Sequence, residues 1–304
     1  MSSTDRPDTA QPSRTVVITG GNSGIGLEAA VALAKQGHRV VIAVRNAHKG
    51  ALALEDIRAR SGSSDVEQMK VDLASLASIR AFADAWYVHD EPVHVLLNNA
   101  GLVQRYRTTT ADGFETTMGV NHLGHFLLTA LLMDALHKGA AQLRPTGGDV
   151  RVINVSSAAH NGARKGLDFD DLMWERRKYS GLGMGAYSAS KLANIMFTRE
   201  LARRLDGSGI SANALHPGFV GSNFAKDGDT GWLGNAVMTV ARPFAHSPAK
   251  GARTSIYLAT SDGVTGQSGG YYARCKPAKI SKWAADDEAC ARLWDLSAEL
   301  TGLG

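Results

Sequence analysis

The sequence has few cysteines and no long apolar run, and each absence excludes a class of protein. Its 304 residues include only two cysteines, Cys275 and Cys290, which form no C-x-x-C motif. A disulfide-stabilised fold is therefore not expected, and a reducing, cytoplasmic location is predicted. No stretch of about eighteen apolar residues occurs, so we expect no transmembrane helix.

Charge is also sparse, because only 20% of the residues are charged and the formal net charge is +4. Without a dense basic run, the sequence does not predict a nucleic-acid-binding protein. A mildly basic surface suits an anionic small ligand instead. The histidines show no metal-ligand spacing with carboxylates or cysteines, so no metal site is predicted. Residues 1–13 are polar and lack the apolar segment of a signal peptide, so we expect a disordered tail.

From residue 14 onward, short apolar runs alternate with stretches of helical spacing. Strands are predicted over residues 14–20, 38–44, 65–73, 93–101, 149–157 and 210–218. Helices are predicted over residues 24–37, 48–62, 75–89, 113–139 and 186–207. This alternation predicts an α/β fold, a single doubly wound Rossmann-type domain over residues 14–304. Its sheet should be mostly parallel, with helices on both faces and ligands at the carboxyl ends of the strands.

Two long segments lack this periodicity. Residues 158–185 are charged and rich in glycine, and residues 221–248 mix glycines with aromatic and aliphatic side chains. Long irregular segments in a compact domain are often binding loops, so we expect both to contact a substrate. A helix pair packed on the domain is an equally good interpretation of the second segment. If that segment is a lipophilic lid, the substrate is a bulky apolar molecule.

The stretch "TGGNSGIG" (19–26) lies between the first expected strand and the first expected helix. Gly20, Gly24 and Gly26 permit a tight turn, and they let backbone N–H groups approach a pyrophosphate at the positive end of the helix. An ordinary glycine-rich turn is the alternative, but the strand–turn–helix context favours a dinucleotide site.

The stretch "VVIAVRNAHKG" (40–50) decides which dinucleotide is expected. An acidic residue that binds the ribose hydroxyls normally ends the second strand, whereas this chain has Val44 and then Arg45. A guanidinium can bind a 2′-phosphate in bidentate fashion, Lys49 can add a charge and Asn46 a neutral hydrogen bond. NADP(H) is therefore predicted in preference to NAD(H), although Arg45 could simply be a solvated residue at a strand end.

Further polar residues follow the third, fourth and fifth expected strands. Asp72 could bind the adenine or cap the next helix, and the cap is the better interpretation from position alone. "NNAG" (98–101) could support the cofactor or be an ordinary turn. "YSASK" places Tyr187 and Lys191 on one helix face, where the ammonium should lower the pKa of the phenol and favour proton exchange. Ser157 is expected at the same sheet edge.

The motifs "TGGNSGIG", "NNAG", "NVSS", "YSASK" and "HPGFVGS", together with Asn121, occur in the order found in the short-chain dehydrogenase/reductase family. The chain resembles this family from Arg14 onward. Within it, "AVRNAHKG", "YSASKLANIMFTRELARRL" and "GGYYARCK" are most similar to the retinol dehydrogenase-like branch.

The resemblance implies catalytic roles for four residues. Tyr187 would be the general acid in carbonyl reduction, and Ser157 would hold the substrate oxygen, with Ser156 the second choice. Lys191 would bind the nicotinamide ribose and tune Tyr187, and Asn121 would hold a relay water. The motifs and the resemblance together predict a cofactor site that comprises Gly20, Asn22, Ser23, Gly24, Ile25, Gly26, Arg45, Asn46, Lys49, Asp72, Leu73, Asn99, Ala100, Gly101, Tyr187, Lys191, Pro217, Gly218, Val220 and Ser222.

We therefore expect an NADP(H)-dependent oxidoreductase that interconverts a carbonyl and an alcohol on a lipophilic substrate of retinoid, steroid, fatty aldehyde or polyketide type. A regulatory NADP(H)-binding protein with little turnover is the main alternative, and a light-dependent protochlorophyllide reductase is a third. Two departures from the family are visible: Ser222 replaces the usual Thr, and the spacer between Ser157 and Tyr187 is long. Family members often pair through two long helices, here near 113–138 and 187–206, so a homo-oligomer is possible.

Overall fold

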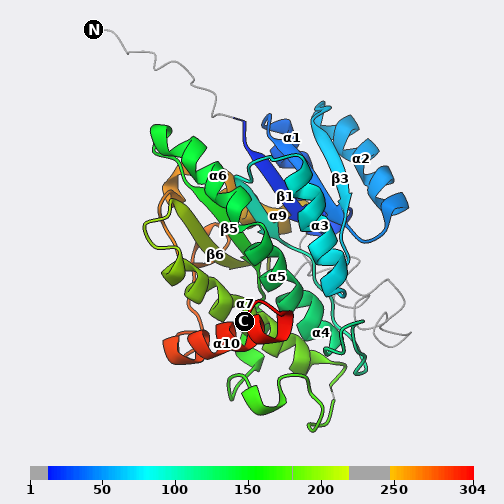
Figure 1. Ribbon diagram of the computed structural model, residues 1–304, viewed down its shortest axis with the longest axis vertical. Coiled ribbons are helices and arrows are strands. Elements are labelled where there is room, and N and C mark those ends of the chain that lie inside the picture. Colours follow the sequence, from blue (N-terminus) through cyan, green and yellow to red (C-terminus); the bar gives the residue numbers. More distant parts are fainter. Residues whose placement is uncertain (1–12, 180, 219–246) are drawn as a thin grey trace.

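The computed structural model describes residues 13–179, 181–218 and 247–304 (Figure 1). Its centre is an eight-stranded sheet with the order β3-β2-β1-β4-β5-β6-β7-β8. All neighbouring strands are parallel except β8, which runs antiparallel to β7. The strands are β1 (Thr15–Thr19), β2 (Arg39–Val44), β3 (Val66–Lys70), β4 (Val95–Asn98), β5 (Val150–Val155), β6 (Ile210–His216), β7 (Tyr271–Ala273) and β8 (Lys276–Pro277).

Helices cover both faces of the sheet, as a parallel sheet requires. The α-helices are α1 (Gly24–Lys35), α2 (Ala47–Ser61), α3 (Leu76–Val88), α4 (Thr116–Met118), α5 (Gly124–Leu131), α6 (Met133–Leu143), α7 (Met184–Arg204), α9 (Pro248–Thr260) and α10 (Asp287–Thr301). One buried apolar cluster joins the sheet to α1, α2 and α9, and another joins it to α3, α5 and α7. The predicted doubly wound fold is thus confirmed, and Figure 1 shows α3 and α5 in front of the strands.

The single long helix expected over residues 113–139 is wrong, because the structure divides it. A π-turn, η1 (Gly119–Leu123), separates α4 from α5, and the Gly124 N–H donates to the Gly119 carbonyl five residues earlier. Close packing surrounds the turn, since a Cβ on Gly124 would lie 2.7 Å from the Leu73 carbonyl oxygen. Apolar periodicity continues through such a turn and does not reveal it.

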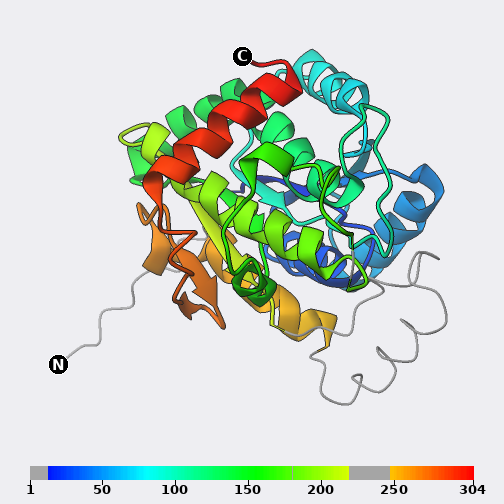
Figure 2. The ribbon, with the colours of Figure 1, turned by 90° about the horizontal axis from the view of Figure 1, so that it is seen from below.

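The sequence interpretation left α9, α10 and the last two strands unassigned. Helix α10 crosses the outer side of α7 (Figures 1 and 2). The Trp294 ring lies 5.0 Å from the ring of Phe126 in α5 and 5.9 Å from that of Phe197 in α7, and the Ser297 hydroxyl lies 2.9 Å from His122 Nε2. Part of the helix pair expected to bind a second copy is therefore covered by the chain's own α10. Pairing through these helices stays a prediction.

No helix in the described part of the chain combines the length and apolar character needed to cross a membrane.

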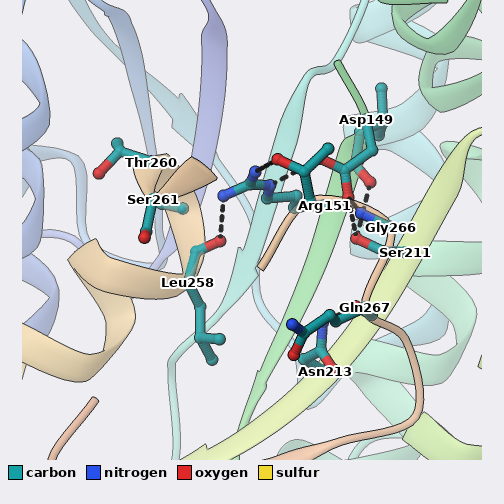
Figure 3. Close-up of polar contacts among 12 residues, drawn as sticks. Asp149, Arg151, Ser211, Asn213, Leu258, Thr260, Ser261, Gly266 and Gln267 are labelled. Carbon is teal, nitrogen blue, oxygen red and sulfur yellow. Dashed lines mark hydrogen bonds and ion pairs between the residues drawn. The ribbon is translucent and has the colours of Figure 1, made fainter. Parts of the chain in front are cut away.

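A buried polar network fastens α9 to the start of β5 (Figure 3). Arg151 donates to Asp149 at 3.0 Å, to the Leu258 carbonyl at 3.0 Å and to the Thr265 hydroxyl at 3.1 Å. Asp149 in turn accepts from the Ser211 hydroxyl at 2.7 Å. Because the Leu258 carbonyl lies in the last turn of α9, the guanidinium satisfies a group that the helix end leaves unpaired.

We expect Arg151→Ala to lower the free energy of unfolding by about 3–5 kcal/mol, because it leaves a buried, uncompensated Asp149. The Arg151 and Asp149 side chains are only 2% and 7% exposed. Arg60, which pairs with Asp56 on the surface, is the matched control, and Arg60→Ala should cost less than about 1 kcal/mol. Denaturant unfolding checks both variants, and equal losses would contradict the account of a buried network.

Candidate active site

The glycine turn between β1 and α1 is shaped so that side chains do not fit. Gly20 and Gly24 have φ angles of +67° and +56°, and a Cβ on Gly26 would lie 2.5 Å from the Gly20 carbonyl oxygen. The N-cap of α1, Ser23, makes no side-chain cap hydrogen bond, and no acidic residue lies in the first turn of the helix. The backbone N–H groups at this helix end therefore suit the pyrophosphate of a dinucleotide. Of the other predicted residues, Asn22 lies in this turn and Ile25 lies at the start of α1.

The end of β4 lies directly against this turn. The N–H groups of Asn99 and Ala100 both donate to the Thr19 hydroxyl, at 2.9 and 3.0 Å, and Asn99 Nδ2 donates to the Thr19 carbonyl at 2.8 Å. The structure thus brings the two predicted "NNAG" residues to the glycine turn. Thr19 is the residue that joins them, and sequence reasoning included it in the motif without giving it a role.

Asn121 occupies the π-turn, and its side chain makes three hydrogen bonds to protein groups. Its Oδ1 accepts from the Leu102 N–H at 2.8 Å, and its Nδ2 donates to the Leu102 carbonyl at 2.9 Å and to the Ser190 hydroxyl at 3.0 Å. The side chain therefore fixes the loop after β4. The role of Asn121 in holding a relay water, which the resemblance implies, stays a prediction.

Ser157, Tyr187 and Lys191 meet at the carboxyl end of β5. Ser157 begins the 3₁₀ turn η3 (Ala158–Gly162) and shares a hydrogen bond with the Tyr187 phenol. The Lys191 ammonium lies 5.6 Å from the centre of the Tyr187 ring and donates to the Val155 carbonyl at 3.0 Å. Ser156 donates to the Lys191 carbonyl at 2.6 Å and is buried. The geometry therefore favours Ser157 over Ser156 as the hydroxyl that faces Tyr187.

Burial dominates the electrostatics of this group. It lowers the pKa of Lys191 to about 8 and raises the pKa of Tyr187, and the hydrogen bond from Ser157 only partly offsets that rise. The expectation that Lys191 lowers the pKa of the phenol is therefore wrong for the ligand-free protein. The hydration that the phenolate loses on burial is the largest effect on this pKa.

Other predicted cofactor residues line the same edge of the sheet. A Cβ on Gly101 would lie 3.2 Å from both Asn121 Oδ1 and the Lys191 ammonium. A side chain at this position would therefore crowd two of the predicted catalytic residues. Asp72 accepts from the Ala74 N–H at 3.0 Å just before α3, while Ser75 is the N-cap of that helix. Asp72 therefore stabilises the turn that leads into the helix, and Leu73 beside it is buried.

The positive cluster lies where the sequence predicted it. Val44 is buried at the end of β2, whereas Arg45, Asn46 and Lys49 are exposed. Asn46 is also the N-cap of α2, because its Oδ1 accepts from the Lys49 N–H at 2.9 Å. The cap bond uses one acceptor position of the Asn46 side chain, and the amide nitrogen can still donate to a ligand.

The end of β6 carries the last predicted residues. Pro217 and Gly218 follow the strand, and the Gly218 N–H donates to His216 Nδ1 at 3.1 Å. Gly218 has a φ of +85°, which a glycine adopts without strain. Val220, Ser222 and most of the predicted segment 221–248 lie outside the described residues.

The described part of the segment 158–185 is anchored to the loop after β4. The Tyr179 hydroxyl lies 3.1 Å from both Glu115 Oε1 and the Gln104 carbonyl, and a Cβ on Gly183 would overlap that carbonyl oxygen. Burial raises the pKa of Tyr179 to about 12, so it remains a hydrogen-bond donor at all ordinary pH values. No pattern in the sequence pairs Tyr179 with Glu115.

Large apolar side chains are exposed beside this anchor. Tyr106 is 67% exposed, and Leu182 and Met184 are each 47% exposed. Leu182 and Met184 flank Gly183, which approaches the Gln104 carbonyl, and Tyr106 follows two residues after Gln104 in the chain.

The model of the family described as short chain dehydrogenase matches residues 14–167 and 176–231. Human retinol dehydrogenase 12 is 42% identical over 298 residues, which cover 98% of this chain and 89% of that protein. Human retinol dehydrogenase 13 is also 42% identical, over 96% of this chain and 86% of its own length.

Solved structures have the same fold. The crystal structure of an uncharacterised protein from Mycobacterium paratuberculosis is 37% identical, with a TM-score of 0.73 over 95% of this chain and 93% of that one. Pseudomonas aeruginosa RhlG, in an active-site complex with NADP, is 26% identical, with a TM-score of 0.64 over 85% of this chain and 93% of that one.

The buried Lys191 should give stability a defined pH dependence. Its pKa falls from 10.5 to about 8 on folding, so between these values the unfolded chain holds a proton that the folded protein has released. Raising the pH through this window therefore stabilises the fold. The free energy of unfolding of the wild type, measured relative to Lys191→Met, should rise from pH 8 to pH 10.5.

Urea unfolding of both proteins at the two ends of this pH window measures the difference in their free energies of unfolding. Subtracting the variant from the wild type cancels the titration of the groups that both proteins share. Lys35→Met, at the exposed end of α1, is the control and should leave the pH dependence of the wild type unchanged. A difference between wild type and Lys191→Met that stays flat with pH would show that Lys191 is not desolvated.

Proposed function

The chain belongs to the short-chain dehydrogenase family, in its retinol dehydrogenase-like branch, and we propose that it is an NADP(H)-dependent enzyme that interconverts a lipophilic carbonyl and its alcohol. The observation that carries the proposal is that Ser157, Tyr187 and the buried Lys191 meet at the sheet edge that also holds the glycine turn. An anion-binding helix end and a proton donor at one sheet edge suit a reaction that moves a hydride and a proton together.

The residues of the site divide the work of this reaction. NADP(H), when bound, supplies or accepts the hydride. Ser157 would donate a hydrogen bond to the substrate oxygen, and Tyr187 would protonate that oxygen in the reductive direction. Lys191 would hold the nicotinamide ribose, and its ammonium would favour the phenolate that Tyr187 leaves behind. A ribose hydroxyl that accepts from Lys191 would also relieve the cost of its burial.

The preference for NADP(H) rests on the end of β2. The position that would bind ribose hydroxyls through a carboxylate is Val44, and exposed Arg45 and Lys49 follow it. A 2′-phosphate would gain a charge-assisted pair there, whereas a carboxylate would repel it. RhlG, a protein of the same fold, was solved in complex with NADP, which supports this choice of cofactor.

The lipophilic substrate is supported by the exposed Leu182 and Met184, which precede Tyr187 closely in the chain, and by the names of the retinol dehydrogenases to which the chain is similar. These side chains offer apolar contact and no charge. A cytoplasmic location and a disordered N-terminal tail remain predictions from the sequence.

Purified protein should oxidise NADPH with ring-bearing or long-chain ketones and aldehydes faster than with acetoin-sized or sugar carbonyls. Tyr187→Phe should lower kcat by about two to four orders of magnitude, the usual contribution of a general acid, while NADPH still binds. Tyr87→Phe, which removes a hydroxyl bonded to Leu131 in another part of the fold, should keep wild-type turnover. Tight NADPH binding with no turnover of any carbonyl would favour a regulatory NADP(H)-binding protein instead.

NADPH should bind at least about tenfold more tightly than NADH, because a charge-assisted pair contributes roughly 1.5–3 kcal/mol. The preference should shrink as salt rises, since Arg45 is exposed. Combining Val44→Asp with Arg45→Ala should reverse it. Arg144→Ala, which removes an exposed charge at another place, controls for net charge. Fluorescence titration gives the dissociation constants, and equal affinities in the wild type would refute the role of Arg45.

A further inference from the structure

Tyr271 is a buried phenol that sequence reasoning gave no role. It pairs in register with Ala214 of β6, which pairs with Asn154 of β5. Residues paired in a sheet point to the same face, and Asn154 Nδ2 donates to Thr198 in α7. The Tyr271 side chain therefore points toward α7, the helix that carries Tyr187 and Lys191. It is only 5% exposed.

The Tyr271 ring lies among residues that frame Ser157. Its centre is 5.2 Å from the ring of His160 and 5.8 Å from that of His216. His160 Nδ1 lies 2.8 Å from the Ser157 carbonyl. Ionisation of Tyr187 raises the pKa of Tyr271 further above the value that burial imposes, so the two phenols are electrostatic neighbours.

The Tyr271 hydroxyl is buried and has no hydrogen-bond partner within the described part of the chain. Its aromatic neighbours are already engaged, since His160 Nε2 accepts from the Ser281 N–H at 3.3 Å and His216 Nδ1 accepts from Gly218. Tyr272, the next residue, shows the ordinary situation, because its hydroxyl donates to Gln267 at 2.9 Å. A buried hydroxyl without a partner destabilises the folded protein, and such groups in native proteins call for an explanation.

We propose that the Tyr271 hydroxyl is a ligand-binding group of the active site, which donates a hydrogen bond to a carbonyl or hydroxyl oxygen of the molecule bound there. The inference rests on the proposed function and extends it by adding a third hydroxyl beside Ser157 and Tyr187. The oxygen can belong to the substrate or to the carboxamide of the cofactor, which present the same acceptor chemistry. The ligand-free protein is then less stable than it could be, because this donor is satisfied only on binding.

Tyr271→Phe separates stability from binding, because it keeps the ring and removes only the hydroxyl. The ligand-free variant should be at least as stable as the wild type in urea unfolding, since no bond is lost. Its ligand affinity should fall by about three- to tenfold, the effect of one neutral hydrogen bond. A rise in the Kd for NADPH identifies the cofactor as the acceptor. An unchanged Kd with a raised KM for the best carbonyl substrate identifies the substrate.

Tyr272→Phe is the matched control, because Tyr272 is as deeply buried and its hydroxyl has a protein partner. This variant should lose stability and keep the wild-type Kd and KM. The proposal is overturned if Tyr271→Phe leaves both Kd and KM unchanged, or if it destabilises the ligand-free protein as Tyr272→Phe does. If the wild type turns over no carbonyl, the proposed function fails, and the NADPH affinity of Tyr271→Phe alone then decides the role of Tyr271.

Discussion

The hydroxyl of Thr19 holds together three parts of the site that come from distant stretches of the chain. It accepts from the N–H groups of Asn99 and Ala100 and lies 2.9 Å from His125 Nε2. Burial lowers the pKa of His125 to about 4, so the ring is neutral. Because both acceptor positions of Thr19 are in use, its proton goes to Nε2, and Nδ1–H donates to the Asn121 carbonyl at 3.1 Å. The glycine turn, the end of β4 and the π-turn are thereby fixed relative to one another.

The chemistry of the site depends on buried polar groups that lower the stability of the fold when no ligand is bound. Lys191 is buried with a lowered pKa, Tyr187 is buried with a raised pKa, and Tyr271 has an unsatisfied hydroxyl among the described residues. Each would be relieved by the ligand proposed here: a ribose for Lys191, and a carbonyl oxygen for the phenols. The stability that the site lacks is supplied elsewhere, by the apolar layers on both faces of the sheet and by the buried Asp149–Arg151 pair.

Local patterns in the sequence were sufficient for the sheet and for most of the predicted site. The strand from Val40 to Val44 is a continuous apolar run because helices cover both its faces. The spacing of the glycines at 20, 24 and 26, between a strand and a helix, is enough to predict the turn. Contacts between distant residues left no such signal. The π-turn at Asn121 depends on the packing of Gly124 against Leu73. The position of the loop around Tyr179 depends on the hydrogen bond between Tyr179 and Glu115. The raised pKa of Tyr187 could not be predicted, since burial depends on the assembled fold.

The central proposal is that a hydride passes between NADP(H) and the carbonyl carbon at this sheet edge, while Tyr187 exchanges a proton with the carbonyl oxygen. The most direct measurement uses NADPH that carries deuterium at both C4 positions and follows the label into the product that purified protein forms from a ring-bearing or long-chain ketone. The account predicts an alcohol that carries one deuterium on the former carbonyl carbon for each NADPH oxidised, as mass spectrometry can show. Oxidation of NADPH without deuterium in the alcohol, or no alcohol from any such ketone, would contradict it.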